Sequence, residues 1–221
     1  MNPAEETLIH DWNRAGDGDL VPARERVEVN DETLRDGLQS PSAIAPSIED
    51  KVEILHLLAE SGVDALDLGL PGAGPHVVRD VTRLAEEIVR HDLPLAANCA
   101  ARTVAADILP VVEIAQRTGL EIEVACFLGS SPIRQYAEGW DMDRLLRLTE
   151  DAVALAAGEG LPVMYVTEDT TRAQPEDLRR LYTTAVEAGA RRVTRYLREV
   201  VDATGEEVAV DWHGHRDRAS P

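Results

Sequence analysis

Two short polar segments, one early in the chain and one near its end, hold the residue types that could do chemistry. Residues 31–39 read Asp-Glu-Thr-Leu-Arg-Asp-Gly-Leu-Gln, and residues 211–217 read Asp-Trp-His-Gly-His-Arg-Asp. The first segment places a guanidinium next to a carboxylate, and the second places two imidazoles two residues apart. Together these groups suit a divalent-metal site with a charged helper beside it.

The metal ligands would be His213, His215 and Asp36. Alternate residues of a strand share a face, so a His-x-His pair can direct both imidazoles to one point. A carboxylate from the early segment would complete the set, which suits Mn, Zn, Fe or Co, and Mg where oxygen ligands dominate. The competing interpretation is that the two histidines belong to a solvated surface.

Two further residues are candidates for catalysis, Arg35 and Glu168. Arg35 is always protonated and is a good donor to an oxyanion that develops during a reaction. Its alternative role is a surface ion pair with Asp31 or Glu32. Glu168 follows an expected strand and would orient a substrate, unless it belongs to an ordinary acidic loop before the next helix.

Gln39 and Arg102 are weaker candidates for substrate binding. Gln39 closes the early segment, beside the proposed cation and metal ligand. Arg102 comes just after an expected strand, where it could meet a carboxylate, although an arginine that faces solvent is the favoured explanation.

The elements that must position these residues alternate between strand-like and helix-like segments. The expected strands are residues 27–30, 65–70, 94–100, 121–127, 163–166, 191–194 and 208–212. The expected helices are residues 47–61, 76–91, 107–118, 141–157, 175–188 and 196–203. Regular alternation of this kind predicts a parallel sheet with right-handed crossovers.

Such a sheet can close into a (β/α)8 barrel or stay open and doubly wound. No Gly-x-Gly-x-x-Gly follows the first strand, which disfavours a dinucleotide-binding fold. The unusual polar residues follow several different strands, and in a barrel all those strand ends meet on one face. We therefore expect an α/β fold of the TIM-barrel type over residues 26–221, incomplete, with about seven strands and without an eighth βα unit. Residues 1–25 would form a polar extension before it.

Composition limits the partners and the compartment. The formal net charge is -19 and the pI about 4.6, so nucleic acid and anionic membranes are disfavoured as partners. Cys99 and Cys126 fall in expected buried strands, which is typical of a reducing cytoplasm rather than of a disulfide scaffold. We expect no secretory signal and no membrane span, because the chain has neither an apolar leader nor a long apolar run.

The two polar segments resemble the signatures of the DRE-TIM metallolyases, and the likeness extends from about residue 27 to residue 217. Residues 68–71 and 167–169 are similar to the family's segments after its second and fifth strands. The chain looks most like the 2-isopropylmalate and homocitrate synthases. The resemblance implies that Arg35 is the catalytic cation, that Asp36, His213 and His215 bind a divalent metal (Mg, Mn or Zn), and that Glu168 is an active-site acid.

The implied activity is an acyl transfer of amino-acid biosynthesis. Acetyl-CoA would condense with a 2-oxo acid in a Claisen-type reaction, followed by hydrolysis of the thioester. A carbon–carbon lyase of the hydroxymethylglutaryl-CoA lyase type is the first alternative, because Arg-Asp-Gly-Leu-Gln also resembles that branch.

The second alternative is a shortened, inactive barrel. The family's Asp-Thr-x-Gly segment after strand 6 has no clear counterpart here, and its asparagine metal ligand beyond strand 7 has none either. An open barrel would expose the edges of its first and last strands, so we expect a homo-oligomer.

Overall fold

The computed structural model describes residues 28–41, 43–194 and 209–211, in which a single parallel sheet follows the order β1-β2-β3-β4-β5-β6-β7. Every strand pairs in parallel with the next strand of the chain. A doubly wound sheet would reverse this order at a switch point, so the order favours the barrel. The strands are β1 (Asn30–Asp31), β2 (Ala65–Asp67), β3 (Ala96–Arg102), β4 (Ile122–Gly129), β5 (Val163–Glu168), β6 (Arg192–Thr194) and β7 (Ala209–Asp211).

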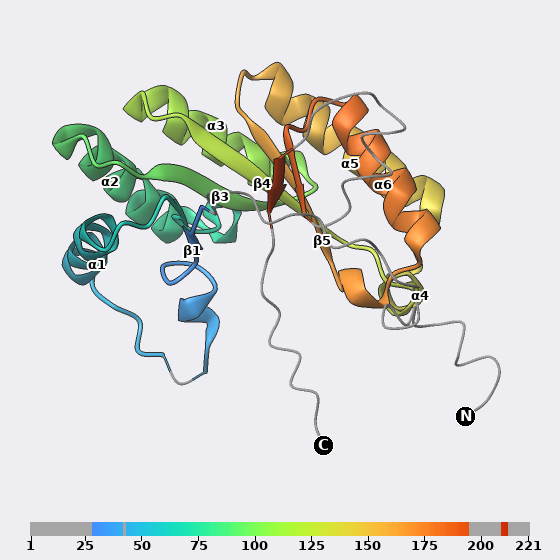
Figure 1. Ribbon diagram of the computed structural model, residues 1–221, viewed down its shortest axis with the longest axis horizontal. Coiled ribbons are helices and arrows are strands. Elements are labelled where there is room, and N and C mark those ends of the chain that lie inside the picture. Colours follow the sequence, from blue (N-terminus) through green and yellow to red (C-terminus); the bar gives the residue numbers. More distant parts are fainter. Residues whose placement is uncertain (1–27, 42, 195–208, 212–221) are drawn as a thin grey trace.

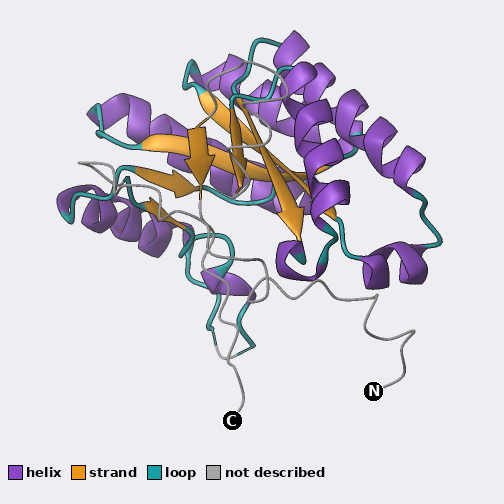
Figure 2. Ribbon diagram, turned by 45° about the vertical axis from the view of Figure 1, so that its right-hand side comes forward, coloured by secondary structure: helices purple, strands orange, loops and turns teal. Residues whose placement is uncertain are grey.

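The sheet curls into half of a barrel (Figures 1 and 2). Six strands, β1 to β6, make up this half-barrel, against the about seven that the sequence predicts. The three residues of β7 add a short pairing with β6 beside it. The α/β class is confirmed, and the curled parallel sheet is consistent with an incomplete TIM barrel.

Helices connect the strands and cover one face of the curled sheet (Figure 1). They are α1 (Ile48–Glu60), α2 (Pro75–His91), α3 (Ala105–Thr118), α4 (Pro132–Glu138), α5 (Met142–Gly158) and α6 (Pro175–Glu187), with one-turn 3-10 helices η1 (Gly37–Gln39), η2 (Pro71–Ala73) and η3 (Thr170–Arg172). The sequence predicted α1, α2, α3, α5 and α6 to within a few residues, but it did not predict α4. The helix expected at 196–203 lies outside the described residues.

Local signals set the ends of these helices. Ser47 and Asp50 form a capping box at the start of α1, in which each side chain accepts a hydrogen bond from the other residue's backbone N–H at 3.1 Å. Pro75 and Pro175 lie in the first turns of α2 and α6, where a missing N–H costs nothing. Among the described helices, none combines the length and the apolar character that crossing a bilayer requires.

The two faces of each strand have different neighbours. On β5, the Tyr165 hydroxyl lies 2.7 Å from that of Thr149 on α5, and the Thr167 hydroxyl lies 2.6 Å from that of Tyr182 on α6. Side chains alternate along a strand, so Glu168 belongs to the opposite, inner face. The two cysteines are fully buried, as expected.

The inner face carries polar groups at its β1–β3 side. Asp67 on β2 is in register with Asn98 on β3, and both side chains are buried. The Asn98 side-chain amide donates to the Asn30 side-chain oxygen at 2.7 Å, which joins β3 to β1 across β2. Asp67 also contacts the loop that follows β1, because its Oδ2 accepts a hydrogen bond from Arg35 Nε.

Candidate functional site

The loop after β1 is a compact turn that fixes the backbone of the early polar segment. Asp31 accepts hydrogen bonds from the backbone N–H of Thr33 at 2.8 Å and from its hydroxyl at 3.1 Å. The backbone carbonyl of Glu32 accepts from the N–H groups of Arg35 at 3.2 Å and Gly37 at 3.0 Å. Leu34 is 5% exposed and anchors the turn in the hydrophobic core.

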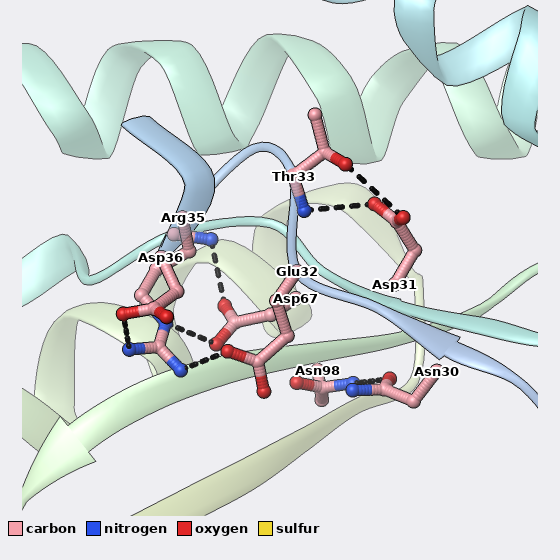
Figure 3. A network of polar contacts seen from close by, with 9 residues as sticks. Asn30, Asp31, Glu32, Thr33, Arg35, Asp36, Asp67 and Asn98 are labelled. Atoms are coloured by element: carbon pink, nitrogen blue, oxygen red, sulfur yellow. Dashed lines mark hydrogen bonds and ion pairs between the residues drawn. The ribbon is translucent and has the colours of Figure 1, made fainter. Parts of the chain in front are cut away.

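The Arg35 guanidinium lies among three carboxylates (Figure 3). Its Nε donates to Asp67 Oδ2 at 2.9 Å, its Nη2 pairs with Glu32, and its Nη1 lies 3.4 Å from Asp36 Oδ1. The ion pair with Glu32 considered from the sequence is present, but it is part of a larger cluster. Because the Arg35 side chain is only 20% exposed, this cation is held in a partly desolvated position rather than free on the surface.

Asp67 is the buried member of the cluster, with 1% of its surface exposed. Its Oδ1 accepts from the backbone N–H of Gly69 at 2.9 Å while its Oδ2 binds Arg35. Burial raises the pKa of Asp67 to about 6, although the Arg35 charge opposes that rise. Burial alone would lower the pKa of Arg35, but the charges of Asp67 and Glu32 raise it overall.

Asp36 is the exposed member, with its side chain 53% accessible to solvent. Its contact with Arg35 is long, so its carboxylate oxygens keep lone pairs that could accept a metal ion. One carboxylate and two imidazoles suit a borderline or hard dication. His213 and His215, the other two expected ligands, lie outside the described residues.

The other candidates lie at or after the ends of different strands of the same sheet. Glu168 closes β5 and is exposed, and its backbone carbonyl accepts from Ser130 after β4. Gln39 is exposed at the end of η1, next to the Arg35 cluster in the chain. Parallel strands bring all these ends to one edge of the sheet, where barrel enzymes place their active sites.

Arg102 has a structural partner that was not expected. Its Nε and Nη2 donate to the two oxygens of Asp107 at 2.7 Å and 2.8 Å, a bidentate pair. Asp107 is 1% exposed and also accepts from the Arg102 backbone N–H at 3.1 Å. The guanidinium therefore already holds a carboxylate of the protein, and a role in substrate binding would have to use its remaining N–H groups.

Sequence reasoning did not single out Asp67, although it is central to the cluster. One signal could have revealed it: it is the lone charged residue in the apolar run Ala-Leu-Asp-Leu-Gly-Leu at 65–70. A carboxylate in such a run must find a partner when the strand is buried. The identity of that partner, 32 positions earlier in the chain, came only from the structure.

The arrangement as a whole presents an oriented cation and a solvent-facing carboxylate side by side. Such a pair can stabilise negative charge that develops on a bound oxygen, and a divalent metal, if held by the carboxylate, would supply further charge stabilisation. A family model described as HMGL-like matches residues 26–220, which is nearly the whole chain. The chain belongs to the HMGL-like family. Its membership confirms the resemblance to the DRE-TIM superfamily.

Relatives with curated names include synthases. The chain is 31% identical over 211 residues to a probable 2-isopropylmalate synthase of Methanopyrus kandleri, covering 87% of this chain and 39% of that protein. It is 36% identical over 166 residues to a 2-isopropylmalate synthase of Heliobacterium modesticaldum, covering 75% and 31%. It is 33% identical over 171 residues to the homocitrate synthase AksA of Methanopyrus kandleri, covering 76% and 40%. The match therefore spans two fifths or less of each relative.

Two solved structures share the HMGL-like fold at low sequence identity. The HMG-CoA lyase of Brucella melitensis superposes with a TM-score of 0.62 at 16% identity, covering 86% of this chain and 73% of that one. The HMG-CoA lyase of Bacillus subtilis gives 0.61 at 18% identity, covering 87% and 70%. At these identities the likeness concerns the fold, and it supports the assignment of an incomplete barrel.

Proposed function

We propose that this chain carries the acyl-transfer site of a metal-dependent synthase that condenses acetyl-CoA with a 2-oxo acid. The observation that supports it most is the Arg35 cluster, in which Asp67 and Glu32 orient a guanidinium beside the exposed Asp36. The names of the relatives, 2-isopropylmalate synthase and homocitrate synthase, point to the same chemistry.

Each residue has a definite part in this proposal. Asp36, His213 and His215 would hold the divalent metal, and Glu168 would contribute an acid at the end of β5. Gln39, which is exposed at the end of η1 shortly after Arg35 and Asp36, would contact the 2-oxo acid. A bound Mg, Mn or Zn ion supplies Lewis-acid polarisation of the keto group.

Arg35 acts on the charge that the reaction creates. A base takes a proton from the acetyl methyl group, and the methyl carbon forms a bond to the keto carbon of the 2-oxo acid. The electron pair of the C=O bond moves to the keto oxygen, and Arg35 donates hydrogen bonds to that alkoxide. The alkoxide then takes up a proton, and water cleaves the thioester to release the CoA thiol.

The test is an assay of thiol release from acetyl-CoA over a panel of 2-oxo acids, with Mg, Mn or Zn present. We expect release with one oxo acid and its loss in Asp36→Ala. The matched control is Asp143→Ala, because the Asp143 side chain is 77% exposed in the first turn of α5 and forms an ion pair with Arg180, not with the Arg35 cluster. Release that is unchanged in Asp36→Ala would contradict the assignment of the site.

Two other outcomes favour the alternatives. Cleavage of a 3-hydroxy-3-methylacyl-CoA without any condensation would indicate a lyase that works on the same fold. Absence of turnover in either direction, together with no metal binding by calorimetry, would indicate a barrel without catalytic activity.

A further inference from the structure

A second group of metal-ligand side chains lies on the helical face of the molecule, between α1 and α2. His56 comes from α1, and Glu87 and His91 come from α2; one ligand atom from each lies within 4.8 Å of the others. None of these residues belongs to the Arg35 cluster at the strand ends. We propose that they form a structural site for a borderline first-row dication such as Zn²⁺.

The distances are close to those of a tetrahedral zinc site. His56 Nε2 lies 2.9 Å from Glu87 Oε1, and His91 Nε2 lies 3.1 Å from the same oxygen. With Zn–N and Zn–O bonds of about 2.0–2.1 Å, tetrahedral ligand atoms stand roughly 3.3 Å apart. The carboxylate oxygen would therefore have to move away from each imidazole nitrogen by only a few tenths of an ångström to accept the ion.

The carboxylate is preorganised for this role. Glu87 and His91 are four residues apart on one helix, so they share a face. Arg83 donates to Glu87 Oε2 at 2.6 Å and thereby turns Oε1 toward the two imidazoles. The Glu87 side chain is 6% exposed, whereas those of His56 and His91 are 35% and 47% exposed. A metal ion could thus reach the ring nitrogens from solvent while the carboxylate stays fixed.

The surrounding charges are compatible with a bound dication. Arg83 and Arg90 oppose it, but Arg90 lies 3.5 Å from Glu87 with a side chain 59% exposed, so it can move into solvent. His91 ends α2, and the C-terminal end of a helix dipole favours a cation. The net charge of -19 adds a field that attracts cations.

The ligand set selects among metals. Two imidazoles and one carboxylate favour Zn²⁺, Cu²⁺, Ni²⁺ and Co²⁺ over Mg²⁺ and Ca²⁺, which prefer oxygen. Each imidazole must offer the lone pair of Nε2, with its proton on Nδ1, so acid should displace the metal. The bound ion would join α1 to α2 and would stabilise the fold without taking part in the reaction at the strand ends.

The experiment uses the full chain with His213→Ala and His215→Ala, which removes the imidazoles expected to bind metal elsewhere. Zn²⁺ affinity is measured by competition with a chromophoric chelator, and the melting temperature is measured with and without Zn²⁺. We expect one Zn²⁺ per chain and a higher melting temperature with Zn²⁺, and no such shift with Mg²⁺.

Adding His91→Gln should weaken Zn²⁺ binding by about tenfold or more and remove the thermal shift. His76→Gln, on the exposed surface of the same helix, should change neither. His56→Gln gives a second, independent removal of one ligand if His91→Gln does not fold. Absence of Zn²⁺ binding in the parent chain, or a Zn²⁺ affinity in His91→Gln and His56→Gln that equals that of the parent chain, would overturn the proposal.

Discussion

Arg35 is held in position by partners that are both near to it and far from it in the sequence. Glu32 and Asp36 are its near neighbours in the chain, but its most buried partner, Asp67, comes from the next strand. An arginine with two or three carboxylate partners loses the freedom to point elsewhere. For a donor to an oxyanion this loss is useful, because the donor is already oriented when charge develops.

Asp67→Asn should separate activity from stability. The variant keeps the shape of the side chain but loses the charge that orients Arg35, so the rate of thiol release in the proposed reaction should fall by about 10²-fold. The control is Asp151→Asn, an exposed aspartate of α5, which should leave the rate unchanged.

The charge of Asp67 that is needed for the proposed activity should lower the stability of the fold as the pH rises. The folded-state pKa of Asp67 is about 6, above its ordinary value, so the native state binds more protons than the unfolded state between about pH 4 and pH 6. As the pH rises from about 4 to about 6, the free energy of unfolding of the wild type should therefore fall by about 3 kcal/mol relative to that of Asp67→Asn. Urea unfolding at several pH values measures the difference; a constant difference would contradict the shifted pKa.

At the scale of elements, one close approach joins η2 to α3. A Cβ added at Gly72 would lie 2.9 Å from the Asp107 Cα and still nearer to its carboxyl group. That carboxyl group is the one that binds Arg102. The close packing of η2 against α3 and the end of β3 therefore requires a residue without a side chain at position 72.

Gly72→Ala should lower the free energy of unfolding by about 1–3 kcal/mol, because the methyl group has no room and displaces the Asp107–Arg102 pair. Gly158→Ala is the matched control, since nothing lies within 4 Å of its added Cβ. That change should be neutral or stabilising by about 0.5–1 kcal/mol through lower entropy of the unfolded chain. Equal effects of the two substitutions in chemical denaturation would count against the packing argument.

A second link between elements is the Glu87 carboxylate, which joins α2 to α1. Hydrogen bonds from His56 and Arg83 lower the pKa of Glu87 to about 2. A depressed carboxyl pKa contributes stability that is present above the ordinary value of about 4.5 and is lost as the pH falls toward 2.

Glu87→Gln should therefore destabilise the protein by about 1–2 kcal/mol at pH 7 in the absence of metal, because its partners His56 and Arg83 are partly exposed to solvent, and by progressively less below pH 4. Glu86→Gln is the comparison, because Glu86 is on the same helix, is 39% exposed and lies 3.6 Å from Arg117. Unfolding curves at pH 7 and pH 3 give both differences. A Glu87→Gln penalty that persists undiminished at pH 3 would show that shape, and not charge, is responsible.

For the whole molecule, the decisive feature is the sheet edge. Within the described residues, β1 pairs with β2 alone, and the half-barrel does not close on itself. Unpaired backbone groups at such an edge favour association with another chain. The net charge of -19 opposes association between identical chains, and salt screens that repulsion.

We therefore expect the 221-residue polypeptide to form oligomers whose size or population increases between low and physiological ionic strength. Analytical ultracentrifugation at two salt concentrations measures this. A compact monomer at both concentrations, with a single cooperative thermal transition, would be the contrary result.

The sequence alone determined most of the local structure, with α4 as the exception, and it determined the family. Caps, prolines and glycines act within a few residues, so the ends of α1, α2 and α6 could be predicted from nearby positions. The order of helices and strands, and with it the parallel sheet, followed from the same short-range patterns. The Arg35–Asp36 pair was found because both residues are adjacent in one distinctive segment; Asp36, His213 and His215 as metal ligands remain a prediction.

Only the tertiary structure decided which distant residues meet. The pairing of Arg35 with Asp67 depends on the register of β1 against β2, and that of His56 with Glu87 depends on how α1 packs on α2. Residues about thirty positions apart carry no local signal of their contact, because loop closure and packing of the whole core set their separation. The sequence therefore indicated an acidic and basic site at the strand ends, while the fold determined how its cation is held.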